Sequence, residues 1–308
     1  MRIASLLASA TEIVCALGLG DALVAISHEC DYPPEALRHP RVSRPRFDPA
    51  GLSSAEIDAA VRDTMARHGS VYELDAERLR ELAPDLLLTQ AVCEVCAVPT
   101  SLAEEASRML PRKPRVVSID SHSVDQILHS ITAVGDAAGV PDRAADVVAA
   151  LRARLDAVRD RVVAAPRPRV LALEWLDPPF VPGHWTPEMV TLAGGELLAS
   201  EPGVASVQLT WDQLGGLDPD VLLVMPCGYG LEAALQDAGR HEEQLMRVAR
   251  RAVDAGGAFV VDGSAYFNRS GPRMVDGVEI LGALLHPDLF QDYDPTGRSA
   301  PWRSGKSP

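Results

Sequence analysis

Continuous apolar runs separated by helical segments constrain the fold of this 308-residue chain more than any other feature. Residues 86–88 (Leu-Leu-Leu) and 221–224 (Val-Leu-Leu-Val) are uninterrupted apolar runs, as expected of strands that are buried on both faces of a parallel sheet. Strands that alternate with helices indicate βαβ units, in which a helix connects two parallel strands. We therefore predict an α/β fold.

The alternation occurs in two series. The first predicts strands at residues 3–7, 23–27, 71–74, 85–90 and 115–119, and helices at residues 11–19, 53–68 and 76–83. The second predicts strands at residues 169–174, 221–225 and 258–261, and helices at residues 187–192, 231–255 and 274–285. Between the two series, residues 123–164 have helical periodicity that is interrupted only at residues 139–142.

The two series share a similar unit, because residues 82–90 and 217–225 each contain a helix end, a Pro-Asp turn and a buried strand. Any βαβ unit can converge on this pattern, but two copies on either side of a long helical segment favour two similar lobes. We expect two three-layer α/β lobes joined by a long backbone helix. The expected boundaries are 1–120 for the N-terminal lobe, 121–167 for the connecting helix, 168–290 for the C-terminal lobe and 291–308 for a Pro- and Gly-rich disordered tail.

The charge of the chain excludes several classes of partner. A net charge of −14 and a pI near 5.0 provide no cationic face for nucleic acid or for an anionic membrane. No stretch reaches the roughly 20 apolar residues of a membrane-spanning helix, so we expect no membrane insertion. Met1 and Arg2 lead directly into a predicted strand without a signal-peptide pattern. This favours a cytoplasmic protein, or an extracytoplasmic one if the N-terminus has been trimmed.

Familiar catalytic signatures do not occur in the sequence. There is no phosphate-binding G-x-x-x-x-G-K-[ST] loop, no nucleophile elbow G-x-S-x-G and no H-E-x-x-H motif. No residue is therefore assigned a catalytic role, and a binding protein is favoured over an enzyme.

The opening strand and helix carry a family resemblance. Residues 9–19 (Ser-Ala-Thr-Glu-Ile-Val-Cys-Ala-Leu-Gly-Leu), together with the Pro-Asp units at 82–90 and 217–225, resemble the helical-backbone class of ABC-transporter substrate-binding proteins. The chain looks most like the cobalamin-binding, vitamin B12-type branch, with siderophore and metal receptors as relatives. The resemblance implies a periplasmic-binding-protein-like fold that captures cobalamin or a related corrinoid between two rigid lobes. It also implies an ABC transporter permease as partner.

Ligands of open parallel sheets bind beyond the carboxyl ends of the strands, which selects a small set of loops. Aromatic residues are only 5% of the chain, yet these loops hold several of them, and aromatic faces suit a flat ligand. A histidine in one loop could serve as an axial ligand to the cobalt of a corrinoid. The alternative is that the aromatic residues fill the seam between the lobes. The candidate ligand-binding residues are Thr11, His28, Tyr32, Trp175, His184, Trp185, Tyr229, Phe267, Asn268 and Arg269.

Four of the five cysteines also fall in the selected loops, whereas Cys15 lies inside the first predicted helix as a packing residue. Cys93 and Cys96 form a C-x-x-C motif, and Cys30 and Cys227 follow other predicted strands. Four such thiolates at one place would suit tetrahedral zinc or an iron–sulfur cluster. Redox or substrate-reactive thiols, and cysteines that only pack, are the alternatives.

Two functions from different classes follow from these features. The first is a ligand-binding protein that captures cobalamin or a related corrinoid for an ABC transporter permease. The second is a cytoplasmic metalloprotein or enzyme on the same scaffold, with a cysteine-ligated zinc or iron–sulfur site. A shared fold alone does not decide between them, because one scaffold can carry many functions.

Overall fold

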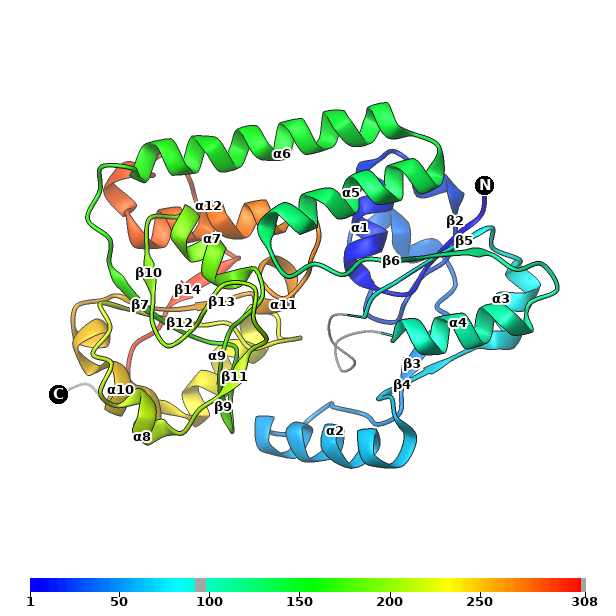
Figure 1. The fold of residues 1–308 in the computed structure, drawn as a ribbon. Helices are drawn as coiled ribbons and strands as arrows, with labels where there is room; N and C mark the ends of the chain where they lie inside the picture. The colour runs from blue at the N-terminus through cyan, green and yellow to red at the C-terminus, as the bar shows by residue number, and fades with distance from the viewer. Residues whose placement is uncertain (92–97, 306–308) are drawn as a thin grey trace. The chain divides into compact units, whose positions relative to one another are not determined.

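The computed structural model describes residues 1–91 and 98–305 of the chain (Figure 1). These residues divide into two compact units. Unit 1 comprises Met1–Leu52, Glu56–Ser121 and Asp125–Ala150, and unit 2 comprises Ser53–Ala55, His122–Val124 and Leu151–Pro308. Each unit has its own sheets, and no sheet of the described residues draws strands from both units.

Unit 1 is built on a four-stranded parallel sheet with the strand order β2-β1-β5-β6. Its strands are β1 (Ile3–Ser5), β2 (Leu23–Ala25), β5 (Leu86–Thr89) and β6 (Arg115–Ser118). A separate antiparallel hairpin pairs β3 (Ser43–Pro45) with β4 (Tyr72–Leu74). The helices that begin in this part of the chain are α1 (Ala8–Ala16), α2 (Ser54–His68), α3 (Ala76–Leu82), α4 (Thr100–Met109) and α5 (Val124–Ala138).

Strand β5 shows why the apolar runs of this sequence are continuous. Leu86, Leu87 and Leu88 are each at most 1% exposed, although successive side chains of a strand point to opposite faces. Leu87 packs in one cluster with Leu79 of α3 and Ala103 of α4. The sheet is therefore covered on both faces, and only the ends of its strands lead into loops.

Unit 2 is built on a five-stranded sheet with the strand order β10-β7-β12-β13-β14. Its strands are β7 (Arg169–Leu173), β10 (Glu196–Leu197), β12 (Val221–Val224), β13 (Ala258–Val261) and β14 (Ser299–Pro301). A smaller antiparallel sheet consists of β8 (Trp175–Leu176), β9 (Pro179–Val181) and β11 (Val207–Gln208). The helices are α7 (Thr186–Leu192), α8 (Trp211–Leu214), α9 (Leu231–Arg240), α10 (Glu242–Asp254), α11 (Gly263–Tyr266) and α12 (Met274–Leu285).

Helices α9 and α10 cover one face of the unit 2 sheet, where they contact β13 and β12. The sequence predicted one helix over residues 231–255, but His241 separates two because its backbone (φ −106°, ψ 20°) is not helical. Helix α7 contacts β10, the edge strand beside β7, and it also contacts α12.

Residues 291–308 were expected to be a disordered tail, and for the described residues this expectation was wrong. Strand β14 pairs antiparallel with β13 and forms an edge of the unit 2 sheet. Trp302 follows it, is only 6% exposed, and donates its backbone N–H to the carbonyl of Ala258 at 2.8 Å. The Ser-Ala-Pro sequence of β14 lacks an apolar pattern, and proline is tolerated at a sheet edge, so only tertiary pairing defines this strand.

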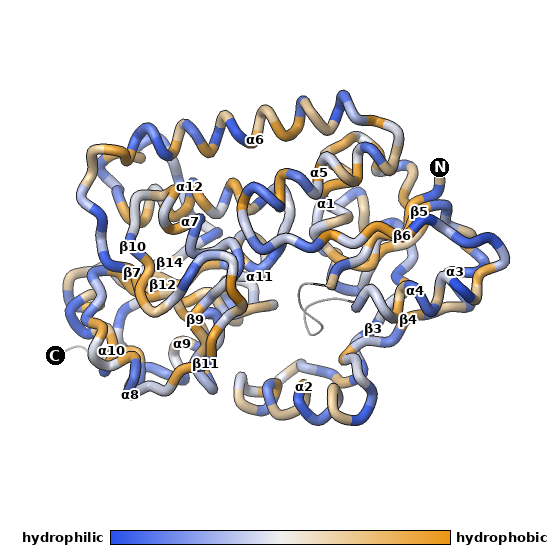
Figure 2. The backbone as a smooth tube through the Cα atoms, viewed as in Figure 1, coloured by the Kyte–Doolittle hydropathy of each residue, from blue (hydrophilic) through white to orange (hydrophobic). Residues whose placement is uncertain are grey.

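The helical segment between the two series is a pair of helices, α5 and α6 (Pro141–Val162), which are separated at the predicted interruption. Gly139 has a φ of +74°, a backbone conformation that favours glycine, and Pro141 begins α6. Residues of α6 up to Ala150 belong to unit 1, and those from Leu151 onward belong to unit 2. Hydrophobic and hydrophilic residues alternate along α6, as Figure 2 shows.

The predicted α/β class is confirmed, and the described strands form separate sheets rather than one continuous sheet. Within unit 2, Arg154 attaches α6 to α12. Its guanidinium donates to Glu279 at 2.7 and 2.9 Å and to Asp276 at 2.7 Å. These two carboxylates raise the pKa of Arg154, so the side chain is always charged.

Replacing Arg154 with alanine should lower the free energy of unfolding by about 1 kcal/mol, because it leaves two neighbouring carboxylates without their shared cation. The side chain is 39% exposed, so solvent screening limits the loss. Urea unfolding measures the change. Arg159→Ala, which removes only exposed pairs with Asp156 and Asp160 on the same helix, should change the free energy by less than about 0.5 kcal/mol. Equal losses in both variants would contradict the account.

Candidate functional site

The carboxyl edge of the unit 2 sheet brings together three of the loops that the sequence selected. Strands β7 and β12 are parallel neighbours, as are β12 and β13, so their following residues lie along one edge. The backbone N–H of Cys227 donates to the carbonyl of Glu174 at 2.9 Å, and that of Ser264 donates to the carbonyl of Tyr229 at 3.1 Å. The loops after β7, β12 and β13 are thus held together by backbone hydrogen bonds.

Two aromatic side chains from different loops meet at this edge. The rings of Trp175 and Tyr229 have centroids 5.3 Å apart and an interplanar angle of 62°, which is an edge-to-face contact. Trp175 donates its indole N–H to the carbonyl of Asp177 at 3.1 Å. Burial, and then the nearby carboxylate of Asp237, raise the pKa of Tyr229 to about 12, so its phenol is neutral near pH 7. Both rings are only half-buried, which leaves apolar surface for a flat partner.

Trp185 and Phe267 differ from what the sequence predicted for ligand-binding residues. Phe267 is fully buried, and Trp185 is 8% exposed. The indole N–H of Trp185 donates to the backbone carbonyl of Phe267 at 2.8 Å. In this structure both side chains pack inside unit 2 and hold its loops in place.

His184 is fixed by its backbone. Its φ is +53°, which is uncommon for a residue with a side chain. Its N–H donates to the carbonyl of Val204 at 2.6 Å, and its carbonyl accepts from Gly203 at 2.9 Å. Gly183 precedes it at a close approach, because an added Cβ would lie 2.3 Å from the Val204 carbonyl oxygen.

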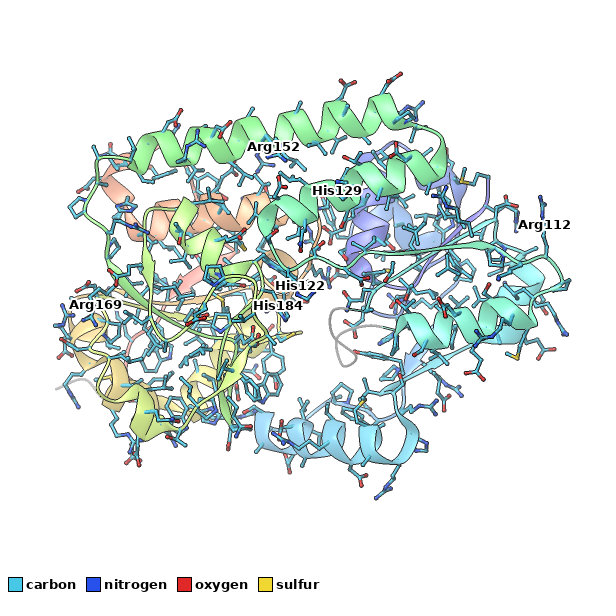
Figure 3. All side chains as sticks on the ribbon, in the orientation of Figure 1. Arg112, His122, His129, Arg152, Arg169 and His184 are labelled. Atoms are coloured by element: carbon cyan, nitrogen blue, oxygen red, sulfur yellow. The ribbon has the colours of Figure 1, made fainter. Side chains whose placement is uncertain are left out.

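His122 lies beside His184, with 3.2 Å between the two Nδ1 atoms, as Figure 3 allows the reader to follow. Both imidazoles are half-buried. Burial, and secondly His122, lower the pKa of His184, so this imidazole is neutral near pH 7. His122 was not among the residues predicted from the sequence, because one histidine before a helix carries no signal without its spatial neighbour.

Polar groups after β13 lie at the same sheet edge. Arg269 donates to the hydroxyl of Ser264 at 3.2 Å, and the backbone N–H of Asn268 donates to the Gly263 carbonyl at 2.9 Å. The side-chain oxygen of Asn268 is buried without a hydrogen-bond partner among the described residues.

Arg298 was missed in the sequence because it precedes β14 in the segment that was expected to be disordered. Its guanidinium carbon lies 5.9 Å from the centroid of the Tyr266 ring, and that of Arg273 lies 5.7 Å from the same centroid. Trp302, a large apolar residue in this segment, is a sequence signal for order there.

Two of the predicted ligand-binding residues, His28 and Tyr32, lie in the loop after β2 in unit 1. His28 has its Nδ1 2.8 Å from the Ser43 hydroxyl and its Nε2 3.1 Å from a carboxylate oxygen of Glu29. Tyr32 is 45% exposed. Thr11 is fully buried and donates its hydroxyl to that of Ser5 at 2.8 Å, so in this structure it is a packing residue rather than a contact surface.

The cysteines give no support to a zinc or iron–sulfur site. Cys30 is fully buried, with its sulfur 3.0 Å from the Thr11 hydroxyl oxygen. Cys227 is half-buried in unit 2, and Cys93 and Cys96 lie outside the described residues. Within residues 1–91 and 98–305, no group of three or more His, Cys, Asp or Glu side chains could hold a metal ion.

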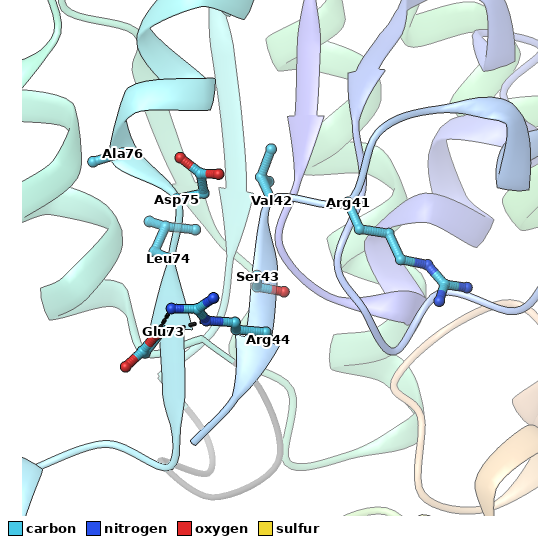
Figure 4. Close-up of a pocket in the computed structure, with 8 residues that line it drawn as sticks. All are labelled: Arg41, Val42, Ser43, Arg44, Glu73, Leu74, Asp75 and Ala76. Atoms are coloured by element: carbon cyan, nitrogen blue, oxygen red, sulfur yellow. Dashed lines mark hydrogen bonds and ion pairs between the residues drawn. The ribbon is translucent and has the colours of Figure 1, made fainter. Parts of the chain in front are cut away.

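A pocket on the β3–β4 hairpin of unit 1 is shown in Figure 4. Arg44 and Arg46 both form ion pairs with Glu73 beside it. None of the ligand-binding residues predicted from the sequence lines this pocket, which is bounded by Arg41, Val42, Ser43, Arg44, Glu73, Leu74, Asp75 and Ala76.

Residues 3–249 match the model of the family described as periplasmic binding protein. The chain belongs to the periplasmic binding protein family. It is 26% identical over 288 residues to the vitamin B12-binding protein of Vibrio cholerae, covering 92% of this chain and 88% of the relative. It is 23% identical over 301 residues to an ABC transporter substrate-binding lipoprotein of Bacillus subtilis, covering 94% and 82%.

Solved structures show the same fold. The periplasmic vitamin B12-binding protein of Vibrio cholerae matches with a TM-score of 0.68 and 23% identity, covering 95% of this chain and 98% of that one. A periplasmic haem-binding protein of Pseudomonas aeruginosa matches with a TM-score of 0.70 and 22% identity, covering 98% and 95%. The resemblance to ABC-transporter substrate-binding proteins is therefore confirmed.

The expected cytoplasmic location was wrong. The matching family is one of periplasmic binding proteins, and one relative is a lipoprotein. Another relative is the vitamin B12-binding protein of Vibrio cholerae, and the solved structure of such a protein from that organism is described as periplasmic. The missing signal-peptide pattern was therefore a poor guide to location. Among the described residues, no helix is both long enough and apolar enough to cross a membrane.

The described thiols should differ sharply in reactivity. Burial, followed by the nearby Glu35, raises the pKa of Cys15 to about 11, so its thiolate fraction at about pH 8 should be roughly a hundredfold below that of an ordinary cysteine. Cys30 should resist alkylation because it is fully buried. Iodoacetamide labelling followed by mass spectrometry measures both.

The labelling is controlled by repeating it in denaturing guanidinium chloride, where Cys15 and Cys30 should react at equal rates. Rapid alkylation of Cys30 in the folded protein would contradict its assignment as a packing residue.

Proposed function

We propose that this protein binds a metal–tetrapyrrole chelate outside the cytoplasm, with a cobalt corrinoid such as cobalamin as the preferred ligand, and delivers it to an ABC transporter permease. The family and the two classes of relative support a substrate-binding role. The name of the Vibrio cholerae relative supports the corrinoid in particular.

The observation that carries the proposal is the aromatic pair at the carboxyl edge of the unit 2 sheet. Trp175 and Tyr229 come from loops after neighbouring parallel strands, and their backbones are joined to the adjacent loops by hydrogen bonds. A fixed apolar surface made of two rings suits a large planar ligand, because little side-chain order must be gained on binding.

Hydrogen-bond donors at the same edge suit the rim of such a ligand. Corrinoids carry amides and haem carries carboxylates around the ring, and both accept hydrogen bonds. Arg269 and the hydroxyl of Ser264 lie together after β13.

Replacing Trp175 with alanine should weaken corrinoid binding by about 1–3 kcal/mol, the range for loss of a buried aromatic contact. Isothermal titration calorimetry with hydroxocobalamin measures the affinity, and a parallel titration uses haemin. Trp211→Phe serves as the matched control, because Trp211 begins α8, which contacts α10, and is not in the loops after β7, β12 and β13. Its affinity should equal that of the unchanged protein.

Three outcomes would contradict the proposal in different ways. Binding of haemin without hydroxocobalamin would exclude the corrinoid and keep the chelate class. Binding of neither would exclude both. Full affinity in Trp175→Ala would show that the aromatic pair is not the contact surface.

A further inference from the structure

We propose that His122 and His184 form a binding site for one divalent transition-metal ion, held by the Nδ1 atoms of both imidazoles. Both histidines lie within unit 2. It does not rest on the proposed function, because the ion would bind in the absence of any chelate.

The separation of the two nitrogen atoms matches two ligands of one ion. At a metal–nitrogen distance of about 2.0–2.1 Å, two ligands at a tetrahedral angle are about 3.3 Å apart. The Nδ1 atoms of His122 and His184 are 3.2 Å apart. The rings are tilted by 46° with centroids 5.3 Å apart, so they are not stacked on each other. The separation of the two nitrogens is therefore compatible with shared coordination of one ion.

The backbone of His184 is fixed in an uncommon conformation by its loop. Its positive φ is maintained by two backbone hydrogen bonds, to Val204 and from Gly203. Residues in such sparsely populated conformations persist only where the surroundings fix them, and they occur often at ligand-binding positions. Trp185, the next residue, is buried and hydrogen-bonded, which fixes the backbone of the loop beside His184.

His122 is held through a residue two positions further along the chain. The backbone N–H of Val124, at the start of α5, donates to the carboxylate of Glu188 on α7 at 2.7 Å. This hydrogen bond joins the two segments that carry the histidines, independently of the imidazole contact.

The chemistry of the pair selects the class of ion. Imidazole suits zinc, nickel and copper, whereas magnesium and calcium prefer oxygen ligands. The described residues offer no third His, Cys, Asp or Glu that would complete a metal-binding group. Water or a donor atom from a bound ligand would therefore occupy the remaining positions. The competing interpretation is a single N–H···N hydrogen bond between two neutral imidazoles, which needs no metal.

The test is a calorimetric titration of the purified protein with Zn²⁺, after removal of any histidine tag. We expect one ion per chain. His122→Ala and His184→Asn should each weaken binding at least about tenfold, since even outer residues of metal sites alter affinity by 10–100-fold. Asparagine is chosen at position 184 because it tolerates a positive φ. The control is His129→Ala, an exposed histidine on α5 that Figure 3 labels, which should bind as the unchanged protein does.

The outcomes separate the two interpretations. Absence of saturable Zn²⁺ binding by the unchanged protein would reduce the pair to a hydrogen bond and overturn the proposal, as would full affinity in both variants. Melting temperatures show whether each variant folds. If one variant unfolds, zinc binding by the other variant decides. Titration of the zinc-free protein with hydroxocobalamin tests the proposed function independently of the zinc result.

Discussion

Burial of both faces of a parallel sheet is the constraint on which the rest of the structure depends. The burial of Leu86, Leu87 and Leu88 shows that both faces of the unit 1 sheet are covered. Residues that can contact a ligand are therefore found in the loops where the strands end. The carboxyl ends of β7, β12 and β13 meet at one edge of unit 2, and their loops are joined by backbone hydrogen bonds. Fold and candidate site therefore have the same physical origin.

Unit 2 contains an apolar aromatic pair and a polar histidine pair, and each pair is held by its surroundings. Trp175 and Tyr229 supply an apolar face whose position costs little entropy to maintain. The strained backbone of His184 instead directs a polar side chain toward His122. The two pairs of side chains thus differ in chemistry, and for this reason we propose a planar ring system as the partner of one and a metal ion as the partner of the other.

Much of this was predictable from the sequence, because apolar periodicity reports burial. The strands at Leu86–Thr89 and Val221–Val224 and the break near Gly139 follow from patterns within a few residues. Strand β14 does not, because its Ser-Ala-Pro sequence is defined only by pairing with β13. The same limit applies to side chains: loop position selected Trp175 and Phe267 equally, but only tertiary packing shows that Phe267 is fully buried.

The central claim is that the carboxyl edge of the unit 2 sheet is a ligand-contact surface. Hydrogen–deuterium exchange with and without hydroxocobalamin tests it most directly, because protection reports contact without any substitution. The account predicts protection at residues 174–177, 226–230 and 262–269, and none on the β3–β4 hairpin at residues 41–46. Protection of the hairpin pocket with unchanged exchange at these three loops would contradict it.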